Sequence, residues 1–319
     1  MPDPLEEHYS YLSDRTKVDR YRTAIGRLVR PGQAVLDLGC GSGLLGLMAL
    51  RAGAARVLFV DRSPVLEMAR RVVGEAGFGD RAAFFQALSY ELELPEQVDV
   101  VLCDHVGYFG FDYDILKLLA DARRRFLRPG GHVIPQRLDL KLAPIESSAC
   151  RQLVQRWRDG SVPPEFSWVA TPAANLKHAV TLEPMDLLAA PATLASLELG
   201  QDAADFLTWH AGFDFNRDAA LDGLAGWFDC VLHDGIRITN APGADDRLER
   251  PQAFLPLEQP VTVRAGQRIE VTVMARPHDH VIAWTVRFPN TGQQLRHSTF
   301  FGLELESALR RRNDTLAGA

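Results

Sequence analysis

Glycine occupies every second position at the end of the segment DLGCGSG, residues 37–43, directly after a short apolar run. Glycine lets a backbone turn sharply and lets a ligand lie against it without an intervening Cβ. The next apolar run along the chain ends in Val60-Asp61. A carboxylate at the end of such a strand can accept both hydroxyls of a ribose, as it does in nucleotide-binding α/β folds. Together these residues predict a site for a nucleoside-containing ligand.

Two ligand classes compete for this loop. A dinucleotide site requires G-x-G-x-x-G, but residue 44 is leucine, so the third glycine is missing. A methyltransferase site has the pattern D/E-x-G-x-G-x-G, which Asp37, Gly39, Gly41 and Gly43 supply. Its cofactor, S-adenosyl-L-methionine, carries a positive sulfonium in place of a pyrophosphate, so a nearby acid attracts it. A strand–turn–helix without a ligand is the third possibility, and Asp61 in register with the loop favours the methyltransferase site over it.

The chain changes character near Pro135. Before it, apolar runs alternate with segments of helical spacing, which predicts a parallel sheet covered by helices on both faces. The expected strands are residues 34–38, 56–60 and 98–103, and the expected helices are residues 44–52, 64–76 and 114–126, the last of them stopped by RPGG at 128–131. We therefore expect an α/β fold whose residues 1–135 form a Rossmann-like methyltransferase domain with an N-terminal helix.

Residues 136–319 have a β-rich pattern and form a second expected domain. Alternating apolar residues predict strands at 137–145, 261–264, 268–274 and 281–288, with Ala265-Gly266-Gln267 as the turn of a hairpin. Within this half, the segment of about 148–192 is rich in Pro and Ala and mainly helical in pattern. It is expected to be an excursion from the β-domain.

Polar residues follow the expected strand 98–103, at the sheet edge where α/β enzymes hold their chemistry. A carboxylate such as Asp104 or Asp112 can orient an amine or guanidine, and His105 can remove a proton near neutral pH. We take Asp104, His105 and Asp112 as the candidate catalytic residues. The alternative is that Asp112 is solvated, and Asp114 is expected to cap the following helix.

The chain resembles the protein arginine methyltransferase family in three segments. Residues 8–21, HYSYLSDRTKVDRY, match the family pattern H-x-x-M-L-x-D-x-x-R-x-x-x-Y. Residues 44–63, LLGLMALRAGAARVLFVDRS, are similar to the family's link between the glycine loop and the ribose acid. Residues 128–135, RPGGHVIP, match the family's junction with a β-barrel. The resemblance therefore covers the N-terminal part of the chain closely and the rest in architecture, and it implies that residues 136–319 form a β-barrel-like domain.

This resemblance implies roles for further residues. Tyr11 would lie near the sulfonium, and Lys17 would face the cofactor carboxylate where the family has arginine. The segment of about 148–192 would be a dimerisation arm, and its Trp157, Phe166 and Leu187 would contact a second subunit. A homodimer is therefore expected.

The acceptor site departs from the family pattern. The family holds a guanidinium with two glutamates, whereas here Asp104, one methylene shorter, stands at the first position and Tyr113 at the second. The family's Thr-His-Trp element beside the acceptor corresponds to residues 248–252, LERPQ. Because two carboxylates that hold a planar cation in a fork are sensitive to length, a different acceptor pose is expected.

The leading expected function is S-adenosyl-L-methionine-dependent methylation of nitrogen on an arginine-like or amine-bearing acceptor. The alternatives are a small-molecule methyltransferase on the same scaffold, and a cofactor-binding regulatory subunit without activity. The sequence leaves open whether the acceptor is a protein, a peptide or a small molecule, which atom is methylated, and how many methyl groups it receives.

Bulk properties narrow the possible partners. A net charge of −6 is unfavourable for a general nucleic-acid partner. No apolar run is long enough to span a bilayer, so no membrane partner is expected. The four cysteines are scattered without a C-x-x-C pair, which indicates a reducing compartment and no metal site. A cytoplasmic location is therefore expected.

Overall fold

The computed structural model describes residues 4–202 and 204–302. Its N-terminal part contains one parallel sheet with strand order β3-β2-β1-β4-β5. The strands are β1 (Ala34–Leu38), β2 (Arg56–Asp61), β3 (Ala82–Gln86), β4 (Val98–Leu102) and β5 (Leu127–Ile134). Every residue of β1 is buried, as expected for a strand covered on both faces. The predicted Rossmann-like architecture is confirmed.

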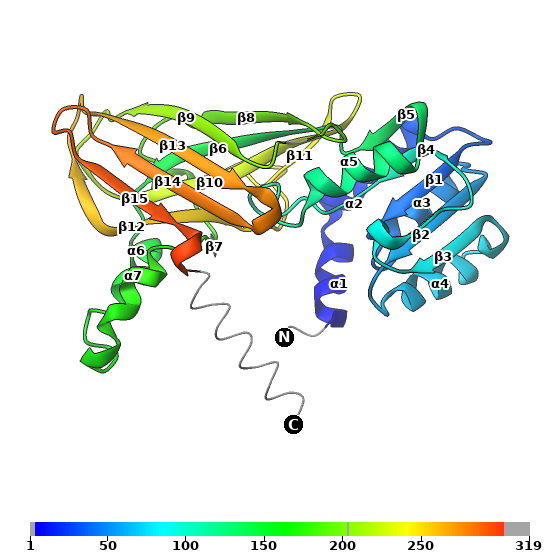
Figure 1. Ribbon diagram of the computed structural model, residues 1–319, viewed down its shortest axis with the longest axis horizontal. Coiled ribbons are helices and arrows are strands. Elements are labelled where there is room, and N and C mark those ends of the chain that lie inside the picture. Colours follow the sequence, from blue (N-terminus) through cyan, green and yellow to red (C-terminus); the bar gives the residue numbers. More distant parts are fainter. Residues whose placement is uncertain (1–3, 203, 303–319) are drawn as a thin grey trace.

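Helices join these strands and cover the sheet (Figure 1). They are α3 (Leu44–Arg51), α4 (Leu66–Glu75) and α5 (Ile115–Arg125). The chain moves outward from β1 to β2 and β3, then returns to the other side of β1 to form β4 and β5. The strand order thus reverses between β1 and β4. In open α/β sheets, ligands bind at the carboxyl ends of the strands beside such a reversal.

Two helices precede the sheet, α1 (Pro4–Ser13) and α2 (Arg15–Leu28). Helix α2 contacts α3 on one side and strands β10 and β11 on the other. It therefore lies between the parallel sheet and the antiparallel part of the molecule (Figure 1). Asp14 begins α2, and its carboxylate accepts a hydrogen bond from the Lys17 backbone N–H at 3.0 Å.

The C-terminal part of the described chain forms two antiparallel sheets. One has the order β7-β12-β10-β6-β8, with β11 paired to β10, and the other has the order β15-β14-β13-β9. Their strands are β6 (Arg137–Ile145), β7 (His178–Val180), β8 (Ala192–Glu198), β9 (Leu207–Asp214), β10 (Ala219–His233), β11 (Ile236–Thr239), β12 (Gln252–Val263), β13 (Arg268–Arg276), β14 (Val281–Arg287) and β15 (Gln294–Ser298). Both sheets contribute buried side chains to one hydrophobic core, among them Phe228 and Trp284. This is the barrel-like part that the sequence predicts.

One predicted turn is wrong. Residues 265–267 do not close a hairpin, because β12 and β13 belong to different sheets and this turn carries the chain from one sheet to the other. Helix α5 ends at Arg125, before the RPGG segment at 128–131 as predicted, and that segment lies inside β5. There Val98 pairs with Leu127 and Val100 with His132, so the intervening residues bulge out of the ladder.

The expected helical arm is also only partly helical. Helix α6 (Ser148–Gln155), a 3₁₀ turn at Pro164–Val169 and α7 (Ala170–Ala173) form its first half. The second half contains β7, a 3₁₀ turn at Pro184–Asp186 and the start of β8. Strand β7 pairs with β12, so hydrogen bonding to the sheet replaces helix formation there. Helices α6 and α7 project from the sheets at the end far from the parallel sheet (Figure 1).

Candidate active site

The glycine loop connects β1 to α3 at the reversal point. Gly39, Gly41 and Gly43 have φ of +65°, +50° and +78°, a region that side chains with a Cβ rarely adopt. The backbone N–H groups of Gly39 and Cys40 donate to the Val60 carbonyl at 2.8 and 3.0 Å. The loop is thus held against the end of β2, and the conformation explains why glycine recurs at alternate positions.

Asp61, at the end of β2, lies directly beside this loop. Its Oδ2 accepts the Gly41 N–H and its Oδ1 the Ser63 N–H, both at 2.8 Å. The predicted ribose acid therefore has a second task, because it fixes the glycine loop from the neighbouring strand. The sequence did not indicate this contact.

Asp37 lies beneath the loop and is almost completely buried. Its Oδ2 accepts the Gly46 N–H at 2.7 Å. Burial raises the pKa of Asp37 to about 7, although the hydrogen bond from Gly46 opposes the shift. A positively charged ligand near the loop would favour the ionised carboxylate.

Two adjoining cavities open beside the loop. One, of about 370 Å³, includes Tyr11, Lys17, Gly41 and Asp104 in its lining. The other, of about 410 Å³, extends from Asp61 toward α5. Gly39, Asp61, Arg62, His105 and Tyr113 line both cavities. Volumes of this size are typical of cofactor sites.

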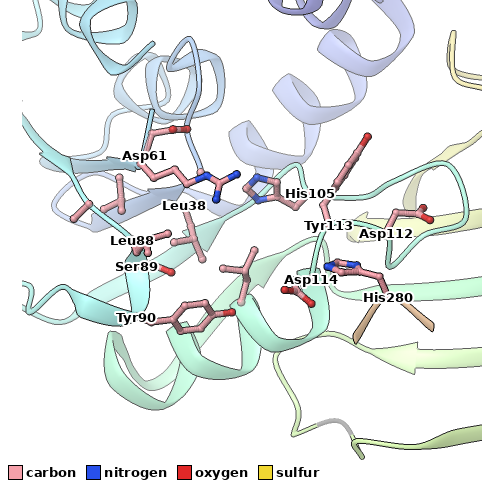
Figure 2. Close-up of a pocket in the computed structure, with 15 residues that line it drawn as sticks. Leu38, Asp61, Leu88, Ser89, Tyr90, His105, Asp112, Tyr113, Asp114 and His280 are labelled. Atoms are coloured by element: carbon pink, nitrogen blue, oxygen red, sulfur yellow. The ribbon is translucent and has the colours of Figure 1, made fainter. Parts of the chain in front are cut away.

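His105 lies at the junction of these cavities, between Asp61 and Tyr113 in Figure 2. A Cβ at Gly39 would stand 1.9 Å from the His105 Cε1 atom, so the imidazole packs directly on the glycine backbone. Its Nδ1 is 3.2 Å from the Cys103 Sγ. Burial lowers the pKa of His105, so the ring is neutral at pH 7 and can accept a proton.

Lys17 and Asp104, predicted for different roles, form a direct ion pair. The Lys17 Nζ lies 2.8 Å from the Asp104 Oδ2, and 4.6 Å from the centre of the Tyr11 ring. Tyr21 donates its hydroxyl to the Asp104 Oδ1 at 3.1 Å. Burial would raise the pKa of Asp104, but the charges of Lys17 and Arg250 and the hydrogen bonds outweigh it and lower the pKa. Asp104 is therefore ionised at the site.

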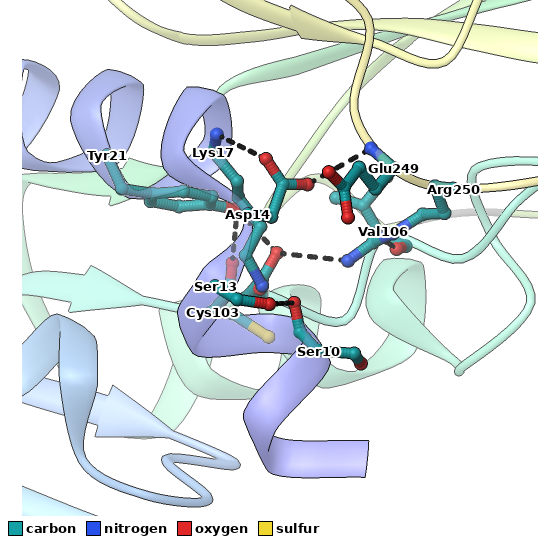
Figure 3. A network of polar contacts seen from close by, with 10 residues as sticks. Ser10, Ser13, Asp14, Lys17, Tyr21, Cys103, Val106, Glu249 and Arg250 are labelled. Atoms are coloured by element: carbon teal, nitrogen blue, oxygen red, sulfur yellow. Dashed lines mark hydrogen bonds and ion pairs between the residues drawn. The ribbon is translucent and has the colours of Figure 1, made fainter. Parts of the chain in front are cut away.

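Residues from three distant segments meet around Lys17 (Figure 3). The Asp14 Oδ2 accepts the backbone N–H of Glu249 at 3.2 Å. The Arg250 guanidinium donates from Nη1 to the Val106 carbonyl, and its Nη2 lies 3.9 Å from the Asp104 Oδ1. Arg250 is a site residue that sequence reasoning did not assign. The signal was its place in the segment that corresponds to the family's Thr-His-Trp element.

Asp112 is separated from the other candidates. Its side chain is only 5% exposed, so the alternative that it is solvated is wrong. The Oδ2 accepts the Phe109 N–H at 2.6 Å, and the Oδ1 forms an ion pair with Lys177. Figure 2 places Asp112 at the far side of the cavity from Asp61. The loop brings Asp104 and His105 to the glycine loop, but not Asp112.

The other two loop positions differ from each other. Asp114 stands at the N-cap of α5 as expected, but with φ of +59° its side chain makes no capping hydrogen bond. Tyr113 is half exposed and lines both cavities and a third one of about 200 Å³. Ser10, Tyr108 and Arg250 also line this third cavity.

The donor set suits S-adenosyl-L-methionine. Gly39 and Gly41 line the 370 Å³ cavity, with the acids Asp37 and Asp61 beside them. Gly43, predicted to line the cofactor too, is buried against Ala69 and Phe59 and does not line this cavity. Lys17 adds a cation to the same cavity. These charges complement a ribose, a sulfonium and an amino-acid end. Within residues 4–202 and 204–302, no cluster of His, Cys, Asp or Glu could hold a metal ion.

Sequence comparison with known proteins supports a methyltransferase site. Residues 35–131 match a family model described as a methyltransferase domain. The chain is 30% identical over 251 residues to a probable protein arginine N-methyltransferase 6.2 of Oryza sativa subsp. indica, covering 76% of this chain and 64% of that protein. It is 27% identical over 286 residues to protein arginine N-methyltransferase 6 of Xenopus laevis, covering 85% and 84%. Over most of its length, the chain is similar to protein arginine methyltransferases, and it spans about two thirds of the length of the Oryza sativa protein.

The fold likeness extends over nearly the whole chain. A structure of the Trypanosoma brucei PRMT1 enzyme–prozyme heterotetrameric complex with AdoHcy superposes with a TM-score of 0.80 at 22% identity, covering 91% of this chain and 96% of that one. The Arabidopsis thaliana protein arginine methyltransferase 10 superposes with a TM-score of 0.80 at 19% identity, covering 92% and 98%. In the part that the structure describes, no helix is long and apolar enough to cross a membrane.

Proposed function

We propose that this protein transfers a methyl group from S-adenosyl-L-methionine to a nitrogen of an arginine-like or amine-bearing acceptor. The observation that carries the proposal is the glycine loop at the reversal of the strand order, fixed by Asp61 and within the matched methyltransferase domain. The AdoHcy in the Trypanosoma brucei structure supports the same cofactor here.

In this proposal, each residue around the two cavities has a separate role. Asp61 would hold the ribose, the glycine loop and Lys17 the amino-acid end, and Asp37 would balance the positive charge. When bound, the cofactor supplies a methyl group whose bond to sulfur breaks as the acceptor nitrogen's lone pair forms the new N–C bond. His105, neutral and at the junction of the cavities, is the group that takes the proton that the nitrogen loses.

Two measurements test this function. Calorimetry should show binding of S-adenosylhomocysteine and none of NAD, and labelled S-adenosyl-L-methionine should transfer its methyl group to a member of a peptide and amine panel. Preference for NAD would overturn the proposal. Cofactor binding without transfer to any acceptor would favour the regulatory-subunit alternative.

A small-molecule acceptor is the second candidate. Both loop carboxylates that could hold a guanidinium are already paired within the chain, Asp104 with Lys17 and Asp112 with Lys177. Such a site differs from one that presents two acids to a peptide arginine. Methyl transfer to metabolites, with none to Gly-Arg-rich peptides, would select this candidate.

We also infer a homodimer built on the arm. Of the three apolar residues expected to contact a partner, only Phe166 is exposed, whereas Trp157 and Leu187 pack partly against their own chain. Trp168, in the same 3₁₀ turn as Phe166, is 57% exposed, and Met185 of the arm segment is 83% exposed. Neighbouring exposed apolar side chains such as Phe166 and Trp168 indicate an interface. Light scattering should give a dimer mass, and Phe166→Glu with Trp168→Glu a monomer; a wild-type monomer would contradict the inference.

A further inference from the structure

Arg250 occupies a central place at the acceptor side of the site. It lines both the cavity of about 370 Å³ and the cavity of about 200 Å³, with only 13% of its side chain exposed. Its Nη1 donates to the Val106 carbonyl, and its Nη2 lies 3.9 Å from the Asp104 Oδ1. The chain therefore brings a guanidinium of its own to Asp104.

The oxygens of Asp104 are accordingly engaged from several sides. Oδ2 pairs with Lys17 at 2.8 Å, and Oδ1 accepts the Tyr21 hydroxyl at 3.1 Å and faces Arg250. A carboxylate binds an incoming guanidinium well when it can offer both oxygens to a fork of two N–H groups. Asp104 cannot offer both while these three partners are in place.

The acids near Asp104 do not offer an alternative binding site for a guanidinium. Asp112 is buried with Lys177 and the Phe109 N–H. The Asp14 carboxylate accepts the backbone N–H groups of Lys17 and Glu249. The Glu249 side chain is exposed at the wall of the smaller cavity, where water and salt screen its charge. An incoming guanidinium beside Asp104 would thus meet two fixed cations, Lys17 and Arg250, while the charges of Asp14 and Glu249 lie at the wall of the smaller cavity.

We propose that Arg250 determines acceptor specificity: it fills the place beside Asp104 that a guanidinium acceptor would occupy, so the acceptor enters with an end that carries no positive charge. The inference rests on the proposed function and, of the acceptors named there, excludes a charged arginine side chain and keeps an uncharged nitrogen. A hydroxyl is a further uncharged nucleophile that could enter. Like charges brought together at a desolvated interface cost several kcal/mol, so an arginine side chain is rejected. Hydroxyl-bearing residues of the smaller cavity, Ser10, Tyr11, Tyr108 and Tyr113, suit an uncharged group.

The test compares Arg250→Gln, which removes the charge, with Arg250→Lys, which keeps it. Binding of a Gly-Arg-rich peptide to protein saturated with S-adenosylhomocysteine is measured by calorimetry, alongside kcat/KM for that peptide, an imidazole, an aniline and a phenol. We expect the Gln variant to bind the peptide about tenfold or more tightly than wild type. The Lys variant should stay close to wild type, and only the Gln variant should gain methylation of the peptide relative to the uncharged acceptors.

The outcomes separate this inference from the proposed function. Melting curves and S-adenosylhomocysteine affinity first establish that both variants are folded. Efficient methylation of the arginine peptide by wild type would overturn the specificity role, as would equal peptide binding by the Gln variant and wild type. Failure of the wild type to bind S-adenosylhomocysteine would instead remove the proposed function; the same comparison of peptide binding, then made on the ligand-free proteins, would still decide the role of Arg250.

Discussion

Replacing Asp37 with asparagine should stabilise the ligand-free protein, and the gain should depend on pH. Burial raises the pKa of Asp37 from 3.8 to about 7. The folded state therefore keeps a proton that the unfolded chain releases, and stability falls as the pH rises from about 4 to about 7. A difference of about three pKa units corresponds to about 4 kcal/mol, reached above pH 7.5. At pH 5 the same relation gives only about 1.5 kcal/mol.

Urea titrations of wild type and Asp37→Asn at pH 5 and pH 8 measure this difference. The amide oxygen of asparagine can still accept the Gly46 N–H, so the variant removes the charge and little else. The stability difference should be about 2 to 3 kcal/mol larger at pH 8 than at pH 5. An equal difference at both pH values would refute a raised pKa for Asp37.

Asp104→Asn provides the control of opposite sign. The charges of Lys17 and Arg250 outweigh burial and lower the pKa of Asp104. Its ionised form therefore stabilises the folded state above the unfolded pKa, and this contribution is lost as the pH falls through the folded pKa. The variant should be destabilised at pH 7 and approach wild type in strong acid, the reverse of the trend at Asp37.

Other residues of the site give shorter predictions. Asp61→Ala should weaken S-adenosylhomocysteine binding by about 1.5–3 kcal/mol in calorimetry, because it loses charge-assisted hydrogen bonds to the ribose and frees the glycine loop; unchanged affinity would exclude Asp61 from the site. Gly39→Ala should lower the free energy of unfolding by about 1–3 kcal/mol, because φ at this position is +65° and the new Cβ would clash with His105. Urea titrations of the double variant Gly39→Ala, His105→Ala should show part of that loss restored. Since burial lowers the pKa of His105, the rate of methyl transfer should stay high as the pH falls to the ordinary histidine pKa of 6.5 and decline below it; the same acid limb in His105→Asn would assign it to another group.

The sequence predicts well those parts of the fold that depend on residues close together in the chain. Residues 34–61 contain strand β1, the glycine loop and the acid at the end of β2. Each of these features is predicted from residues that are neighbours in the sequence. The errors concern pairing between distant segments. The turn at 265–267 has hairpin composition, but the composition of a turn is the same whether the flanking strands pair or enter different sheets. Strand β7 forms because β12 provides its hydrogen-bond partners, and its own residues do not show that.

The candidate site also has a part that can be predicted from local sequence and a part that depends on contacts between distant segments. The glycine loop and Asp61 follow from local sequence motifs, whereas the proposed acceptor side is assembled from residues near 104, 177 and 250, whose contacts with each other and with Lys17 depend on the tertiary structure. Sequence reasoning identified the shortened acid at Asp104 but could not show that Lys17 and Arg250 compensate its charge. That compensation matters more than the lost methylene. An acid of either length that is already paired presents little net charge to an acceptor, so the cations that surround Asp104 decide which acceptors can approach it.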